Sequence, residues 1–151
     1  MSTQILSIVP TSATFVPHSV AQAEAIRFLR SLISDAREIK LWESNGPQFI
    51  YPHEYFKQVN CPACHTEITD WWFDAVDNAY KGKFEDLAIT TPCCRTLTTL
   101  NDVEFIGEAA FAQFALEIYD AEVAYEGLSP NEVAELESIL NCPIKQVITR
   151  V

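Results

Sequence analysis

The sequence predicts an α+β protein: a split β-α-β (ferredoxin-like) sandwich interrupted by an inserted segment. Two observations predict the sandwich, because a strand–helix–strand pattern stands near each end of the chain. A third observation, two close pairs of cysteines in the middle, predicts the insert. We expect the sandwich to occupy residues 1–45 and 107–151, and the insert to occupy residues 46–106.

The N-terminal β-α-β unit is built around a helix that begins near Ser19. Ser19 and Gln22 match the S-x-x-Q capping box, in which two side chains satisfy free backbone N–H groups. A short strand is expected at 13–15, before the helix, and a second at 37–44, where apolar and polar residues alternate. The apolar face of the helix is predicted to comprise Ala25, Phe28, Leu29, Leu32 and Ile33.

The C-terminal unit repeats this order. Residues 114–120 alternate in strand fashion, and residues 143–151 form a predicted final strand. Between them, Ser129 and Glu132 form a second capping box, with Pro130 at the first helical position, where its missing N–H costs nothing. The predicted apolar face of this helix comprises Val133, Leu136, Ile139 and Leu140.

The inserted segment is predicted to begin with a strand at 47–52 and to contain a helix at 70–80. Trp72, Val76 and Ala79 share one face of this helix, and Gly82 suits its end. Trp71 and Trp72 are interpreted as packing between the insert and the sandwich rather than as a ligand platform.

The cysteines carry the most specific chemical signal. Cys61-Pro62-Ala63-Cys64 is a C-P-x-C knuckle, a tight turn that directs two sulfurs at one metal ion. A C-x-x-C pair alone is also the motif of a redox dithiol. A second pair, Cys93 and Cys94, follows a predicted strand and favours Zn²⁺ held by four thiolates. The insert is therefore expected to be zinc-ribbon-like.

The second pair is unusual because its cysteines are adjacent. When residues 91–95 are laid over 61–65, Cys94 falls on Cys64 and Thr91 falls on Cys61. Both thiolates reach one ion only if the turn bends sharply. Two alternatives therefore stay open: His65 replaces Cys93 as the fourth ligand, or the cluster is metal-free or redox-active.

Several segments together carry a resemblance to a known family. They are the C-P-x-C knuckle, "DWWFDAVDNAY", "LAITTPCC" leading into "TLNDVEF", "FAQFALEIYD" and the terminal "LNCPIKQVITR". With these segments the chain resembles a family of small bacterial zinc-ribbon-containing proteins. The resemblance implies a zinc ribbon and no catalytic residue, since the family has no established biochemical function. Arg95 departs from it, because glycine is expected after the second knuckle.

Composition limits the compartment and the partners. Five cysteines, an odd number, fit a metal site plus one spare thiol, and Cys142 is interpreted as a small buried hydrophobe. The N-terminus has no basic residue before its apolar residues, and no apolar run approaches the ~20 residues of a membrane span. We therefore expect a cytoplasmic protein whose thiols are reduced, with no membrane partner.

Charge is distributed unevenly along the chain. Residues 1–60 hold five basic and five acidic residues, so the net charge of −11 arises entirely in residues 61–151. Ten acidic residues and no basic residue lie between Arg95 and Lys145. This charge opposes nucleic-acid binding and either keeps the protein soluble or attracts a basic partner.

The functional hypothesis is a non-catalytic, zinc-stapled interaction module. It is an acidic protein that binds or neutralises a basic protein partner docked between Asp102 and Glu137. The expected partner-binding residues are Glu117, Asp120, Glu122, Glu126, Glu132 and Glu135. The alternative is an enzyme, either a thiol–disulfide oxidoreductase or a zinc-dependent hydrolase. Arg95 beside Cys94 favours the redox activity, while no general base for a hydrolase is evident.

Overall fold

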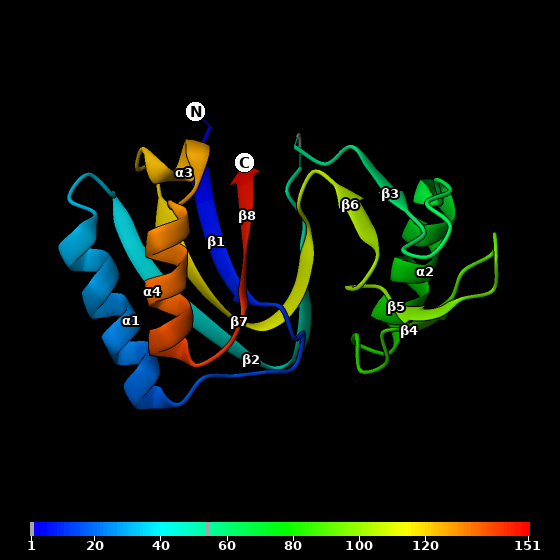
Figure 1. Cartoon of the computed structure of the whole chain (residues 1–151), viewed down its shortest axis with the longest axis horizontal. Helices are drawn as coiled ribbons and strands as arrows, with labels where there is room; N and C mark the ends of the chain where they lie inside the picture. The colour runs from blue at the N-terminus through cyan, green and yellow to red at the C-terminus, as the bar shows by residue number, and fades with distance from the viewer. Residues whose placement is uncertain (1, 54) are drawn as a thin grey trace.

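The computed structural model describes residues 2–53 and 55–151. The protein is a mixed α+β structure whose largest sheet has four strands in the order β2-β7-β1-β8. Its strands are β1 (Gln4–Pro10), β2 (Glu38–Ile50), β7 (Ala110–Tyr119) and β8 (Ile144–Arg150), and each neighbouring pair is antiparallel. Strands from both ends of the chain therefore alternate within one sheet (Figure 1).

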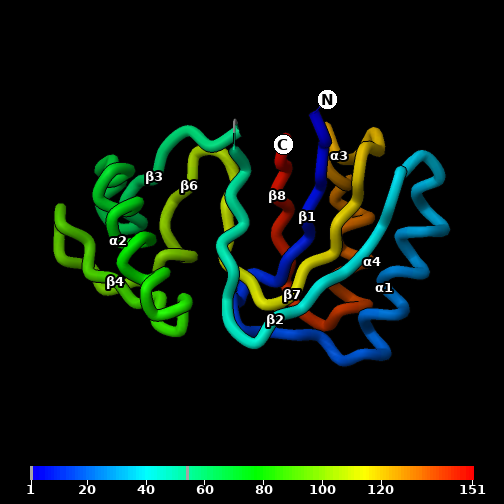
Figure 2. The backbone as a smooth tube through the Cα atoms, turned by 180° about the vertical axis from the view of Figure 1, so that it is seen from behind, coloured from blue at the N-terminus to red at the C-terminus, as the bar shows by residue number. Residues whose placement is uncertain are grey.

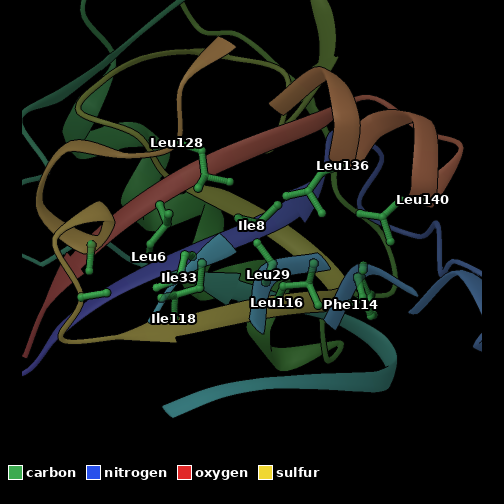
Figure 3. Packing of buried hydrophobic residues seen from close by; sticks show 13 residues of the cluster. Leu6, Ile8, Leu29, Ile33, Phe114, Leu116, Ile118, Leu128, Leu136 and Leu140 are labelled. Carbon is green, nitrogen blue, oxygen red and sulfur yellow. The ribbon is translucent and has the colours of Figure 1, made fainter. Parts of the chain in front are cut away.

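Three helices pack on one face of this sheet: α1 (Ser19–Leu32), α3 (Val123–Glu126) and α4 (Pro130–Leu140). Figure 3 shows how their side chains meet those of the sheet. Leu6 and Ile8 of β1 and Leu116 of β7 lie against Leu29 of α1 and Leu136 of α4, and all five are fully buried. The alternation predicted for residues 114–120 is confirmed, because Phe114, Leu116 and Ile118 of β7 enter this core.

The remaining elements form a cysteine-bearing lobe, residues 58–106, beside the sheet (Figures 1 and 2). It contains α2 (Thr69–Lys81) and four three-residue strands. Strand β3 (Gln58–Asn60) pairs with β6 (Glu104–Ile106), and β4 (Ala88–Thr90) pairs with β5 (Leu97–Thr99). The predicted helix in the insert is thus confirmed, and it ends at Gly82.

Trp72 joins the lobe to the sheet. Its indole is fully buried and lies 5.6 Å from the ring of Phe49 in β2 and 6.2 Å from that of Phe111 in β7, measured between ring centroids. Its Nε1–H donates to the carbonyl of Leu100 over 3.2 Å. The packing predicted for Trp72 is therefore confirmed. Trp71 is only partly buried against the same core.

Two predicted strands differ from the structure. Residues 13–15 form no strand, and the first strand is instead β1. The reason is that β1 is a central strand: it is covered on both faces, so it is almost continuously apolar and lacks the alternation used to find strands. The predicted strands at 37–44 and 47–52 form one long strand, β2, with a register shift between Glu43 and Gln48. The expected boundary at residue 46 lies within β2.

The first capping box is also not formed. The helix begins one residue earlier than predicted, so that His18 is its N-cap and Ser19 lies within the first turn. The side chain of Gln22 turns inward and donates to the carbonyl of Pro17 over 2.9 Å. Leu32 is 40% exposed, because the buried face of α1 follows Gln22, Ala25 and Leu29.

The second capping box is confirmed. The backbone N–H of Glu132 donates to the Ser129 hydroxyl over 3.3 Å, and the N–H of Ser129 donates to the Glu132 carboxylate over 2.9 Å. Cys142 is half-buried against the helical core, and burial raises the pKa of its thiol. No helix among the described residues has both the length and the apolar character needed to cross a membrane.

Candidate metal centre

The first knuckle follows β3 and is closed by backbone hydrogen bonds. The N–H of Cys61 donates to the carbonyl of Thr66 over 2.8 Å, and the N–H of His65 donates to the carbonyl of Cys61 over 3.0 Å. His65 has a φ of 62°, in the left-handed region. This turn reverses the chain tightly enough to bring Cys61 and Cys64 to the same side.

The second knuckle joins β4 to β5 and repeats the same turn thirty residues later. The N–H of Thr91 donates to the carbonyl of Thr96 over 2.9 Å, and the N–H of Arg95 donates to the carbonyl of Thr91 over 3.0 Å. Arg95 has a φ of 56°, matching His65. The predicted alignment of the two knuckles is confirmed, and arginine adopts here the left-handed conformation for which glycine was expected.

The two knuckles bring four sulfurs together. The Sγ atoms of Cys61, Cys64, Cys93 and Cys94 all lie within 4.8 Å of one another. Cys61 and Cys94 are 3.6 Å apart, and Cys64 and Cys93 are 3.3 Å apart, so neither pair is a disulfide. Among the described residues, this is the one group of three or more potential ligands that could hold a metal ion.

The sulfur positions fit a tetrahedral metal ion. A zinc–thiolate bond of about 2.3 Å places neighbouring sulfurs of a tetrahedron about 3.8 Å apart. The distances of 3.3 and 3.6 Å lie slightly below this value, and the 4.8 Å limit lies above it. The adjacent cysteines both contribute because Cys93 occupies the place of Ala63 in the repeated turn, while Thr91 occupies the place of Cys61.

Hydrogen bonds from the turns prepare the first pair of sulfurs as ligands. The backbone N–H groups of Cys64 and Ala63 donate to the sulfur of Cys61 and lower the pKa of its thiol to about 6. The hydroxyl and backbone N–H of Thr66 lower the pKa of the Cys64 thiol. Thiolates bind metal ions, so both effects favour the ligand form.

Cys93 has the opposite protonation preference when no metal is bound. Burial of its sulfur among the other thiols, followed by its contact with Cys64, raises the pKa of the Cys93 thiol to about 12. Four thiolates held this close would repel one another, and the raised pKa of the Cys93 thiol favours a proton on this sulfur. A dication would offset that repulsion and displace the proton, which couples metal binding to pH.

Threonine hydroxyls surround the sulfurs, and this feature was missed in the sequence. The Oγ1 of Thr66 lies 3.2 Å from the sulfur of Cys64, and the Oγ1 of Thr96 lies 3.1 Å from that of Cys94. Thr91 is almost fully buried and accepts the N–H of Thr96 over 3.0 Å. The repeat of threonine two residues after Cys64 and Cys94 was the available signal.

His65 does not belong to the sulfur cluster. Its Nδ1 lies 3.0 Å from a carboxylate oxygen of Glu104 on β6, and the contact lowers the pKa of that carboxyl together with the stronger hydrogen bond from Asn60. The four-sulfur group contains Cys93 and leaves His65 out. The structure thus favours the all-cysteine ligand set over the histidine alternative.

Three of the six acidic residues proposed for partner binding make internal contacts. Glu117 accepts a hydrogen bond from the Tyr119 hydroxyl over 3.0 Å. Asp120 accepts from Arg37 over 2.8 Å and from the backbone N–H of Gln4 over 2.9 Å. Glu132 is part of the capping box of α4.

The other three acidic residues, Glu122, Glu126 and Glu135, are exposed on the helical side of the sheet. Glu117 points the opposite way, because its neighbours Leu116 and Ile118 fill the helix-facing core. The structure therefore brings together the acidic residues of α3, α4 and their flanks, and it separates Glu117 from them.

Comparisons with known proteins found no match to this chain. No protein-family model matches the chain, and no curated protein or solved structure matches it significantly. Fold and site together define a mixed α+β protein with a candidate four-cysteine metal centre. Its function therefore has to be argued from its own residues.

Proposed function

We propose that the protein is a non-catalytic interaction module whose cysteine-bearing lobe is stapled by one Zn²⁺. The observation that carries the proposal is the closed set of four sulfurs within 4.8 Å of one another. Structural zinc sites have four protein ligands, whereas catalytic sites keep one position for water or substrate. Bound zinc would link the two knuckles and thereby hold α2 and the short strands of the lobe in place.

The redox alternative lacks support from Arg95, the residue that favoured it. A thiol–disulfide oxidoreductase needs an accessible thiol of lowered pKa. Cys61, whose thiol pKa is lowered to about 6, is fully buried, whereas Cys64, whose thiol pKa is also lowered, is exposed. Arg95 makes no ion pair with any described acidic residue, and it does not contribute to the pKa shifts of Cys61, Cys64 and Cys93.

The proposal includes a ferredoxin-like split β-α-β sandwich with an inserted zinc ribbon. The first β-α-β unit would comprise β1, α1 and β2, and the second would comprise β7, α4 and β8. The strand order β2-β7-β1-β8, with the helices on one face, supports this assignment. The free state of all five cysteines agrees with a reducing, cytoplasmic location.

We further propose that the acidic helical side meets a basic protein partner. Glu122, Glu126 and Glu135 support this part of the proposal, because they are exposed and make no ion pair with a described basic residue. Their field would raise the association rate with a basic surface and lose strength as salt is added. Glu132 contributes less to this surface, since its carboxylate closes the cap of α4.

Elemental analysis of the protein, purified under reducing conditions, tests the zinc site. We expect one zinc per chain, and we expect Cys64→Ser and Cys93→Ser each to lose most of it. Cys142→Ser is the matched control, because this cysteine lies outside the cluster, and it should retain the metal. A metal-free protein whose melting curve is unchanged by a strong chelator would refute the proposal. Iron found in place of zinc would change the identity of the proposed metal.

Charge reversal tests the acidic surface. Glu126→Lys with Glu135→Lys should slow association with a basic partner isolated from the source cells at least several-fold at low salt. The matched control is Asp74→Lys with Asp77→Lys on α2, which makes the same charge change on the lobe. Equal rates for both double variants, unaffected by salt, would assign these acidic residues to solubility alone.

A further inference from the structure

A groove lies between α1 and β2, at the edge of the main sheet. It has a volume of about 560 Å³, and its walls are Ala23, Ile26, Arg27 and Arg30 from the helix and residues 39–41 from the strand. Counted from Ala23, the four helical residues stand at positions i, i+3, i+4 and i+7, so they form one stripe along α1. Figure 2 shows α1 at the outer edge of the molecule, beside β2.

The groove is basic in a strongly acidic protein. Arg27, Arg30 and Lys40 contribute to its walls, which is three of the ten basic residues in a chain of net charge −11. The two arginines lie on the helical side of β2, whereas the side chain of Lys40 lies on the opposite face of the sheet. The guanidinium groups of Arg27 and Arg30 make no ion pair or hydrogen bond with another described residue. Lys40 is held in position because its ammonium lies 4.9 Å from the centroid of the Tyr119 ring.

Beside these side chains, β2 presents a free strand edge. It is the terminal strand of the sheet and pairs with β7 on one side only. The backbone groups of residues 38–43 therefore have hydrogen-bond partners only in β7, within the part of the chain that the structure describes. Half of the N–H and C=O groups of such a strand point outward and can pair with another extended chain.

We propose that this groove binds an extended acidic segment of another protein, which adds to the sheet as a strand beside β2. The free backbone groups of β2 specify an extended polypeptide. The two arginines on the helical side of β2 and Lys40 on its opposite side specify that this polypeptide is acidic. The surface is separate from the acid-bearing α3 and α4 and goes beyond the function proposed above. A module with both surfaces would hold two partners of opposite charge.

The spacing of the cations defines the segment further. Arg27 and Arg30 lie one turn apart on α1, about 5–6 Å between Cβ atoms. Alternate residues of an extended chain lie on one face, about 6.8 Å apart, so two acidic residues at positions i and i+2 match the two arginines. Lys40 projects from the other face of β2, since Ile39 and Leu41 face the helical core, and it would meet position i+1. The expected motif is therefore three consecutive acidic residues.

Fluorescence anisotropy with a labelled peptide tests the proposal. The probe is a nine-residue peptide with a central Glu-Glu-Glu flanked by valine and threonine, and a peptide with central Lys-Lys-Lys is its control. We expect saturable binding of the acidic peptide at physiological salt and none of the basic one. Arg27→Glu with Arg30→Glu should weaken binding at least tenfold, while the equal charge change Lys81→Glu with Lys83→Glu should alter it less than twofold.

A second probe separates strand addition from simple charge attraction. The same acidic peptide with N-methyl groups on alternate residues keeps its charge but loses the N–H groups needed for pairing, so it should bind at least tenfold more weakly. Equal binding of the methylated peptide would overturn strand addition. Absence of saturable binding, or tighter binding of a single-stranded oligonucleotide of equal charge, would overturn the assignment of an acidic polypeptide.

Discussion

Replacing Trp72 tests the junction between the cysteine-bearing lobe and the main sheet. Its side chain is fully buried and lies within 6.2 Å, between ring centroids, of five other aromatic rings. A buried aromatic side chain removes about 150–250 Å² from water, worth about 4–6 kcal/mol at about 25 cal/mol per Å². Core substitutions of Phe or Trp by Ala cost about 3–5 kcal/mol, so the two estimates agree.

The hydrogen bond of Trp72 adds to this cost. Its indole N–H donates to the carbonyl of Leu100, a fully buried residue, and the substitution leaves that carbonyl unpaired. An unpaired buried acceptor costs about 1–3 kcal/mol. We therefore expect Trp72→Ala to lower the free energy of unfolding by about 5 kcal/mol, a large part of the stability of a domain of this size.

Urea denaturation of the metal-loaded protein, followed by far-UV circular dichroism, measures this loss. Trp72→Phe keeps an aromatic ring and removes the hydrogen bond, so it should cost about 1–3 kcal/mol. Trp71→Ala is the matched control; its side chain is only partly buried, and it should cost clearly less than Trp72→Ala. A loss below about 1 kcal/mol for Trp72→Ala would refute the inferred role of this ring in joining the lobe to the sheet.

Substitutions at three further positions test local features of the fold. Gly107→Ala should destabilise the protein by about 2 kcal/mol or more in urea denaturation, because φ is +83° and an added Cβ would lie 2.0 Å from the carbonyl oxygen of Tyr55; a neutral effect would contradict this backbone geometry. Ser129→Ala should cost about 0.5–2 kcal/mol by removing the cap of α4, and Ser129→Asp should restore most of it. The hydrogen bond from Arg37 lowers the pKa of Asp120 from 3.8, so its stabilising effect is present above that pH and is lost as the pH falls through the lower folded value. Asp120→Asn should therefore unfold with a weaker acid dependence than the parent protein, and identical acid profiles would contradict the contribution of this pair.

Features that depend on a few neighbouring residues could be predicted from the sequence. The knuckle at Cys61 and Cys64 is closed by hydrogen bonds within six residues, and the cap at Ser129 is closed within four. Proline, cysteine and threonine at fixed spacing specify such turns because the bonding groups lie within the turn itself. For the same reason, the sequence alone was enough to predict that the second knuckle aligns with the first.

Features that depend on distant neighbours were decided only by the tertiary structure. The strand β1 was not predicted, because its sequence lacks an alternation of polar and apolar residues. It lacks this alternation because β7 and β8 flank it and both its faces are covered. The side chain of Gln22 does not form the predicted cap. It donates to the carbonyl of Pro17 instead, because packing of α1 on the sheet buries it.

The distribution of charge shows the same division. The sequence by itself determined that the second part of the chain is acidic, but it could not determine which acidic residues share a surface. That depends on which face of β7 packs against the helices, and this turns Glu117 away from Glu135. Likewise, Arg27 and Arg30 are separate from Lys40 in the sequence, and the three residues line one groove only because α1 packs beside the edge strand β2. Side-chain chemistry is a property of single residues, whereas a surface requires the packing of elements far apart in the chain.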